Sequence, residues 1–144
     1  MTEIVSRNPE ETFEAGRKFA AGLAQNSVVG LYGNLGSGKT VFVKGICDYF
    51  NVKNDVNSPT FIIVNEYTGF DNARKSVLNI YHFDLYRLKN LKELTDTGFE
   101  NYLATDNSLC IIEWPELADE YKSVSLVKVN LSPGDSPGER IIKY

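Results

Sequence analysis

A glycine-rich loop at residues 33–40 is the part of the sequence with the clearest chemical meaning. It reads Gly-Asn-Leu-Gly-Ser-Gly-Lys-Thr and matches the P-loop pattern Gly-x-x-x-x-Gly-Lys-[Ser/Thr], by which proteins hold nucleotide phosphates. Its glycines lack a Cβ atom, so the backbone can turn tightly and its N–H groups can approach phosphate oxygens closely. Lys39 is spaced to reach the β- and γ-phosphates, and Thr40 to place its hydroxyl on Mg²⁺. The loop therefore predicts binding of a nucleotide together with Mg²⁺.

Two carboxylates are candidates for the second acidic group that a hydrolytic P-loop protein needs at the end of a neighbouring strand. Four apolar residues precede Glu113, which is the form of a Walker-B strand with Glu where Asp is commoner. Asp84 ends another predicted strand, and His82 lies on the same face of that strand because side chains alternate. Each carboxylate could instead cap the segment that follows its strand, and His82 could instead be a structural residue.

The elements expected around these residues start with a strand before the loop and a helix after it. Residues 28–32 form a short apolar run, and apolar positions at helical spacing follow over residues 39–50. An earlier helix is predicted from the cap Asn8 to Gln25, because a proline at its first position and a glutamate two residues later complete a strong helix start. The further expected elements are strands at 61–67, 77–84, 109–113, 124–130 and 140–144, an interrupted helical stretch at 88–104, and a helical turn at 116–121.

The order of these elements predicts an α/β fold. Strands and helices alternate at first, whereas later strands follow one another without a long crossover, so the sheet should be mixed. We expect a three-layer P-loop NTPase fold with a mixed, mainly parallel central sheet. A length of 144 residues favours a single domain over residues 1–144.

The charge of the chain argues against nucleic acid as its direct ligand. A formal net charge of −4 and a pI near 5.0 provide no basic field to displace the counterions of DNA or RNA. The first residues are charged and lack the apolar core of a secretion signal, and no apolar run reaches the roughly 18 residues of a membrane span. Cys47 and Cys110 stand far apart in apolar stretches, which favours two reduced, buried thiols over a zinc site. We therefore expect a cytoplasmic protein that binds neither membrane nor DNA.

The motifs together resemble those of one family, the bacterial TsaE (YjeE) ATPases. The phosphate loop matches that of the family, in which alanine is more usual than Ser37. Residues 58–61 (Ser-Pro-Thr-Phe) are similar to the switch-like segment of the family, and residues 82–87 (His-Phe-Asp-Leu-Tyr-Arg) to its most distinctive motif. Residues 113–116 (Glu-Trp-Pro-Glu) are similar to its Walker-B-like end. The resemblance covers the chain from about residue 12 to residue 116.

This resemblance implies an ATPase that takes part in making the threonylcarbamoyladenosine of tRNA beside the anticodon. The implied partners are the TsaD and TsaB proteins, with tRNA reached only indirectly through their complex, and the implied activity is slow without them. In the pattern of the family Thr40 and Glu113 contact Mg²⁺, Asp84 supports the metal or the attacking water, and Thr60 senses the γ-phosphate of ATP. The expected catalytic residues are Lys39, Thr60, Asp84 and Glu113; the expected metal ligands are Thr40, Asp84 and Glu113; and the expected nucleotide-binding residues are Thr12, Gly33, Asn34, Leu35, Gly36, Ser37, Gly38, Lys39, Thr40, Val41 and Arg140.

Several of these roles have alternatives that the sequence leaves open. Thr60 either senses the phosphate or simply starts a strand. Trp114 is expected to fill the core rather than to pack beside the nucleotide. Thr12 and Arg140 border the nucleotide if the N-terminal helix and the last strand fold over the site.

Two other functions share the phosphate loop. A small-molecule kinase of the P-loop class needs a lid and several arginines around the phosphates. The five arginines here are spread along the chain, and only Arg87 adjoins a site motif, where a surface ion pair is an equal interpretation. A GTPase switch would carry the Asn-Lys-x-Asp pattern that reads guanine, and the sequence lacks it, which favours ATP.

Overall fold

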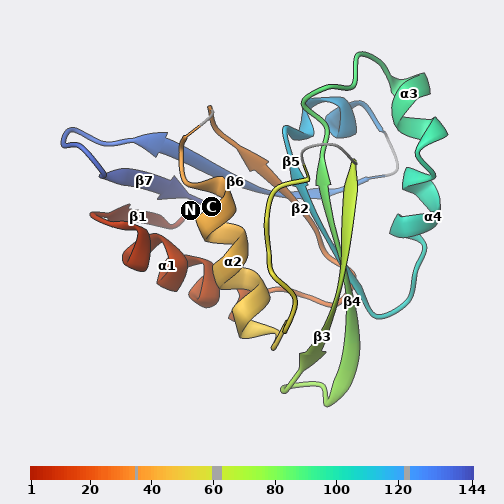
Figure 1. The fold of residues 1–144 in the computed structure, drawn as a ribbon, viewed down its shortest axis with the longest axis horizontal. Coiled ribbons are helices and arrows are strands. Elements are labelled where there is room, and N and C mark those ends of the chain that lie inside the picture. Colours follow the sequence, from red (N-terminus) through yellow and green to blue (C-terminus); the bar gives the residue numbers. More distant parts are fainter. Residues whose placement is uncertain (35, 60–62, 122–123) are drawn as a thin grey trace.

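The computed structural model shows a seven-stranded sheet with helices on both faces (Figure 1). It describes residues 1–34, 36–59, 63–121 and 124–144. The strands are β1 (Glu3–Ser6), β2 (Val28–Tyr32), β3 (Val64–Asp71), β4 (Ser76–Asp84), β5 (Ser108–Glu113), β6 (Leu126–Pro133) and β7 (Arg140–Lys143). The helices are α1 (Pro9–Ala21), α2 (Lys39–Tyr49), α3 (Leu91–Asp96), α4 (Phe99–Leu103) and the 3₁₀ helix η1 (Pro115–Glu120).

The sheet is mixed, with a parallel centre. Its strand order is β1-β7-β6-β2-β5-β4-β3, and the neighbours β6, β2, β5 and β4 run parallel to one another. The pairs at both edges, β4 with β3 on one side and β7 with β6 and β1 on the other, are antiparallel. The predicted mixed, mainly parallel sheet is confirmed. In such a sheet ligands bind beyond the carboxyl ends of the parallel strands, and the phosphate loop follows β2 at that end.

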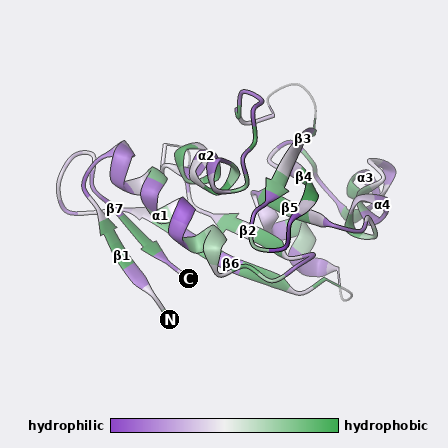
Figure 2. Cartoon of the chain, turned by 90° about the horizontal axis from the view of Figure 1, so that it is seen from below, coloured by the Kyte–Doolittle hydropathy of each residue, from purple (hydrophilic) through white to green (hydrophobic). Residues whose placement is uncertain are grey.

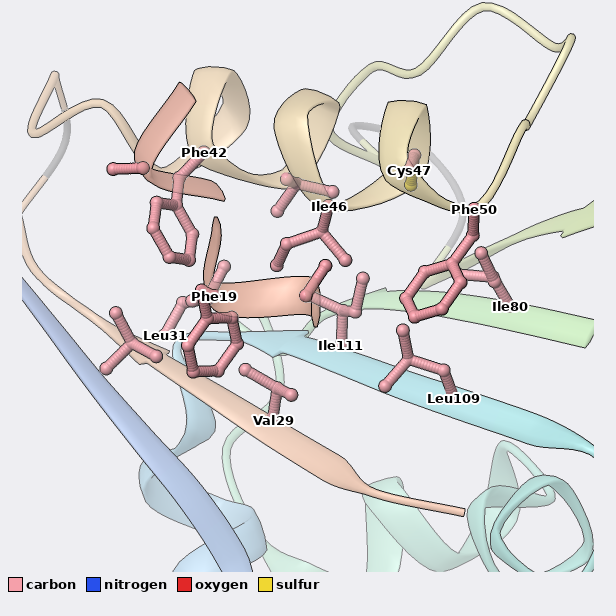
Figure 3. Packing of buried hydrophobic residues seen from close by; sticks show 14 of the residues in the cluster. Phe19, Val29, Leu31, Phe42, Ile46, Cys47, Phe50, Ile80, Leu109 and Ile111 are labelled. Atoms are coloured by element: carbon pink, nitrogen blue, oxygen red, sulfur yellow. The ribbon is translucent and has the colours of Figure 1, made fainter. Parts of the chain in front are cut away.

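Two apolar cores separate the three layers of the fold. Helices α1 and α2 cover one face, where their side chains pack against alternate residues of the central strands, such as Val29, Ile80 and Ile111 (Figure 3). The intervening residues of β4 and β5, including Phe83, point to the other face and pack under α3, α4 and η1. Strand β2 is mostly coloured as hydrophobic, whereas α1 carries both kinds of residue, as expected of a helix that covers a sheet (Figure 2).

Helices α1 and α2 approach each other closely because glycines lie at their crossing. A Cβ atom built on Gly16 would lie 2.3 Å from the carbonyl oxygen of Phe42, and one on Gly45 would lie 2.1 Å from that of Phe13. Both distances are far below van der Waals contact, so only glycine fits at either place. This crossing positions α2, whose first turn carries the phosphate loop.

Substituting Gly45→Ala should therefore destabilise the protein strongly. Backbone has to move to admit the methyl group, and we expect the free energy of unfolding to fall by about 3 kcal/mol or more. Urea denaturation followed by circular dichroism measures this change. The matched control is Gly22→Ala, because a Cβ there meets nothing nearer than 3.7 Å and the φ of −96° suits alanine. A control that is destabilised as much as Gly45→Ala would contradict the crossing argument.

The two cysteines are buried free thiols, as the sequence predicted. Burial raises the pKa of Cys47 and of Cys110 to about 12, so both stay protonated and unreactive at neutral pH. We expect neither thiol of the folded protein to be alkylated by iodoacetamide at about pH 8, and both to react after unfolding in urea. Mass spectrometry counts the adducts, and rapid labelling of the folded protein would contradict the expectation.

Four elements differ clearly from the sequence-based expectations. Strand β6 runs over Leu126–Pro133 instead of 124–130, because its pairing with β7 continues to Pro133. Helix α1 ends at Ala21 instead of Gln25, because the N–H of Gly22 turns back to the carbonyl of Phe19 and Asn26 takes a φ of 60°. Strand β1 was not predicted, since four residues carry little signal and the strand forms by pairing with the distant β7. Strand β3 extends to Asp71, four residues beyond the prediction, while residues 61–62 of the predicted strand lie outside the described residues. None of the described helices is long and apolar enough to cross a membrane.

Candidate nucleotide site

A cavity of about 480 Å³ lies where the phosphate loop meets the carboxyl ends of β4 and β5. Most residues predicted to bind or act on the nucleotide line it, although they come from separate parts of the chain. They are Thr12, Gly36, Ser37, Gly38, Lys39, Thr40, Val41, Asp84, Glu113 and Arg140. The volume is within the range of sites that enclose small-molecule ligands.

Two of the predicted residues that the structure describes, Gly33 and Asn34, are not in that lining. Gly33 and Asn34 contribute carbonyl oxygens at the base of the loop, which accept from Lys39 Nζ at 2.6 Å and from the N–H of Ser37 at 3.1 Å. Leu35 and Thr60 lie outside the described residues. Their predicted roles therefore stay predictions.

The phosphate loop passes directly into helix α2, as the sequence predicted. Gly38 caps the helix with a φ of 96°, in the left-handed region that glycine favours, and its carbonyl accepts from the N–H of Phe42. The helix thus points its positive dipole end and free N–H groups into the cavity, an arrangement that attracts phosphate. Gly33 leaves no room for a side chain, since a Cβ would lie 2.5 Å from the carbonyl oxygen of Leu131.

The ammonium group of Lys39 is held at the base of the loop. Its Nζ donates to the carbonyl of Gly33 and lies 3.9 Å from the centre of the Trp114 ring. Burial lowers the pKa of Lys39, and the nearby carboxylates of Glu113 and Asp84 oppose that shift. A cation with so few water partners is well prepared to bind a phosphate oxygen.

Oxygen atoms from helix α2, strand β5 and the connection before β3 meet beside Lys39. The hydroxyls of Thr40 and Ser58 are 2.6 Å apart, and Ser58 Oγ donates to Glu113 Oε2 at 2.9 Å. Burial alone would raise the pKa of Glu113, but the hydrogen bond and charge of His82, the bond from Ser58 and the charge of Lys39 together hold it below its usual range. Glu113 is therefore a carboxylate beside two hydroxyls.

This donor set fits Mg²⁺, which prefers oxygen ligands and takes only one or two carboxylates when phosphates complete its shell. The described residues contain no group of three or more His, Cys, Asp or Glu side chains that could hold a metal by themselves. The residues that would hold the ion are Thr40 and Glu113, with Asp84 in the same cavity.

Asp84 lies beside Glu113, because these two residues are partners in the parallel pairing of β4 and β5. Burial raises the pKa of Asp84, the hydrogen bond from the N–H of Tyr86 to Oδ1 opposes the shift, and the charge of Glu113 adds to it. Asp84 thus caps the following turn and also lines the cavity, so both sequence-based interpretations describe its position. His82 and Asp84 lie two residues apart on β4 and so share one face of that strand, as predicted. His82 hydrogen-bonds to Glu113, and Asp84 is the residue paired with Glu113 in the sheet.

Sequence reasoning missed or misplaced four of the lining residues, which are Pro9, Ser58, Trp114 and Gly138. Ser58 opens the Ser-Pro-Thr-Phe segment, whose signal was assigned to Thr60 alone. The prediction that Trp114 fills the core is wrong. Strand β5 ends at Glu113, and Trp114 takes a φ of 55° that lets its ring line the cavity and lie 4.8 Å from the ring of Tyr86.

The opposite end of the cavity is closed by the start of α1 and the start of β7. Arg140 Nη2 donates to the carbonyl of Gly36 at 2.8 Å and so braces the phosphate loop. Thr12 is buried, with its hydroxyl 2.6 Å from that of Ser6 on β1. The N-terminal helix and the last strand therefore do fold over the site, as the placement of Thr12 and Arg140 required.

The fold and the loop together define the class: this is a P-loop NTPase fold with its phosphate loop at the carboxyl edge of a mainly parallel sheet. The chain belongs to the family described as "Threonylcarbamoyl adenosine biosynthesis protein TsaE", which matches residues 6–142. This result confirms the family resemblance seen in the sequence.

Individual relatives agree with the family. The tRNA threonylcarbamoyladenosine biosynthesis protein TsaE of Rickettsia felis is 37% identical over 129 residues, which are 89% of this chain and 71% of that protein. The protein of the same name from Bacillus subtilis is 38% identical over 113 residues, 78% of this chain and 66% of the relative. The crystal structure of YdiB from Bacillus subtilis superposes with a TM-score of 0.72 at 27% identity, covering 98% of this chain and 82% of YdiB.

Proposed function

We propose that this protein is a Mg²⁺-dependent ATPase that serves tRNA threonylcarbamoyladenosine biosynthesis in the cytoplasm by acting on the TsaD–TsaB complex. The observation that carries the proposal is the meeting of Lys39, Thr40 and Glu113 in one cavity, although Glu113 comes from a strand far along the chain. The family membership and the names of the relatives support the pathway.

Each residue has a distinct part in the proposed hydrolysis. The N–H groups of the loop and the start of α2 bind the phosphates, and Lys39 leaves the carbonyl of Gly33 to bind the β- and γ-phosphates. Bound Mg²⁺ would neutralise the charge that develops on the phosphates. Thr40 and Glu113 would hold this ion, and Asp84 would support the ion or orient the attacking water. Thr60, in the segment that follows Ser58, would sense the γ-phosphate.

The remaining predicted residues would bind the rest of the nucleotide. Gly36, Ser37, Gly38 and Val41 belong to the loop and the first turn of α2, and Thr12 and Arg140 would border the nucleotide at the far end of the cavity. The net charge of −4 suits a protein that reaches tRNA only through partners.

A small-molecule kinase receives less support. Within the described residues Arg140 is the arginine that lines the cavity, and a kinase usually surrounds the transferred phosphoryl group with several.

Measuring phosphate release from ATP by the chain alone, and then with TsaD and TsaB, tests the proposal. We expect slow turnover that rises at least about 10-fold with both partners present, because completing a catalytic site or adding one stabilising group commonly has effects of this size or larger. GTP in the same assay is the control for nucleotide choice. An ATP turnover that is the same with and without TsaD and TsaB, or faster turnover of GTP than of ATP, would overturn the proposal.

A further inference from the structure

A ring of hydrogen bonds, fully buried at His82 and partly buried elsewhere, runs from Glu113 through side chains of which His82 and Tyr67 have no part in the proposed function. His82 Nε2 lies 2.6 Å from Glu113 Oε2, and His82 Nδ1 lies 3.3 Å from the hydroxyl of Tyr67 on β3. That hydroxyl is also 3.2 Å from the carbonyl oxygen of Asn57. Asn57 directly precedes Ser58, whose hydroxyl donates to the same Glu113 oxygen. The contacts therefore start and end at Glu113.

The chemistry of the groups decides which atoms carry protons. Oε2 of Glu113 accepts from Ser58 Oγ and lies within hydrogen-bond distance of His82, so the proton between the two side chains belongs to His82 Nε2. His82 is fully buried and Glu113 is 3% exposed, so water cannot replace this bond. The single proton of the Tyr67 hydroxyl goes to the carbonyl of Asn57, so the hydroxyl oxygen accepts from Nδ1 and both ring nitrogens of His82 donate. This second partner orients the ring, as it does for histidines around metal sites.

The two oxygens of Glu113 are used differently. Both hydrogen bonds, from His82 and from Ser58, go to Oε2, and no described residue gives one to Oε1. Glu113 also lines the cavity. Rotating the carboxylate would break both bonds in a nearly dry environment, so Oε1 is the oxygen left for a cation.

Packing alone does not require a histidine at this position. Ile80 lies two residues earlier on the same face of β4 and is fully buried among apolar side chains. An imidazole between a phenol and a carboxylate is costly to bury unless its hydrogen bonds are made. His82 makes both of them.

We propose that His82 is a positioning residue of the ATPase: it holds Oε2 of Glu113, leaves Oε1 for the metal, and through Tyr67 couples this carboxylate to the segment starting at Asn57. Ser58 donates to the same oxygen, Oε2, so the position of Ser58 and the orientation of the Glu113 carboxylate depend on each other. The inference rests on the proposed function for its metal, and its first test needs no nucleotide.

The first test uses the imidazole nitrogens of the nucleotide-free protein. The chain contains one histidine, so a two-dimensional ¹⁵N–¹H spectrum shows a single ring without ambiguity. We expect a slowly exchanging proton on Nε2 at neutral pH, and a clear change of the ¹⁵N shifts in Glu113→Gln. A ring with its only proton on Nδ1 would overturn the pairing.

The second test compares two substitutions of His82, each of which places an amide nitrogen near one of the two ring nitrogens. The amide nitrogen of His82→Gln can reach Glu113 as Nε2 does, whereas that of His82→Asn stands near the place of Nδ1 and cannot. Calorimetry measures ADP binding with and without Mg²⁺, and ADP avoids turnover. We expect the apparent Mg²⁺ affinity to fall at least about 10-fold in His82→Asn, as for other residues that orient metal ligands, and much less in His82→Gln.

Binding of ADP without Mg²⁺ separates positioning from general damage. It should be unchanged in both variants, because His82 does not line the cavity. Unchanged Mg²⁺ affinity in His82→Asn, or an equal loss with and without Mg²⁺, would overturn the proposal.

Tyr67→Phe removes one hydroxyl with little risk to folding and tests the coupling. The described hydrogen bonds of Tyr67 do not include one to Glu113, yet we expect loss of its hydroxyl to weaken Mg²⁺ binding about 3-fold or more through His82 and Asn57. Wild-type Mg²⁺ affinity in this variant would refute the coupling. A wild-type chain that binds no nucleotide would refute the ATPase instead, while the imidazole spectrum still reports the pairing of His82 with Glu113.

Discussion

Lys39→Ala is expected to abolish tight nucleotide binding. Lys39 supplies the positive charge of the phosphate loop and is buried. Its ammonium group donates to the carbonyl of Gly33 in the same loop. Removing a charged partner of a phosphate from such an environment weakens binding on the order of 100-fold. Calorimetric titration with ATP and with ADP measures the loss, which should be similar for both because we propose that Lys39 binds the β-phosphate, which both nucleotides have.

The matched control for this substitution is Lys44→Ala. Lys44 lies on the same helix, is exposed, and does not line the cavity. It should bind ATP like the wild type. If Lys39→Ala kept its affinity, or if Lys44→Ala lost as much, the assignment of the phosphate site to this loop would be wrong.

Glu113→Gln is expected to stop hydrolysis while leaving the nucleotide bound. The amide has nearly the same shape as the carboxylate but no charge, so the ion loses its anionic ligand while the loop keeps its phosphate contacts. We expect turnover to fall by about 100-fold or more, the usual effect of removing one group that stabilises charge in a transition state. Single-turnover assays at saturating ATP give the rate, and titration without Mg²⁺ should give an affinity close to that of the wild type.

Glu120→Gln serves as the control for this charge. Glu120 is an exposed glutamate at the end of η1 and is not part of the cavity lining. Its turnover should match the wild type. Equal losses of binding and of hydrolysis in Glu113→Gln would refute the division of labour between the loop and Glu113.

Helices and strands specified by consecutive residues were predicted well, whereas those that depend on residues far apart in the chain were not. Strand β2, the loop and helix α2 were placed almost to the residue, because the apolar run, the glycines and the helical spacing are consecutive. The predicted end of α1 and the predicted extent of β3 were less accurate, because several neighbouring residues could each end the helix or start the hairpin turn. Strand β1 was missed because its partner β7 lies at the far end of the chain.

The same reason explains which site residues were found. The sequence motifs that contain Lys39, Thr40 and Glu113 indicate phosphate and metal binding by their residue types alone. Serine and tryptophan do not by themselves indicate a nucleotide site, so the roles of Ser58 and Trp114 depend on where the fold places them. Ser58 meets Thr40 across 18 residues and Glu113 across 55.

The sequence by itself determined that this protein carries a phosphate loop with a lysine, a threonine hydroxyl beside it and two strand-end carboxylates, because adjacent residues specify that loop through backbone geometry. Only the tertiary structure decided what lies around it. The pairing of β4 with β5 brings His82 to Glu113 across 31 residues, and the turn after β5 places Trp114 over Lys39 instead of in the core. These contacts arise from sheet register and burial, which depend on strands far apart in the chain and leave no local pattern to read.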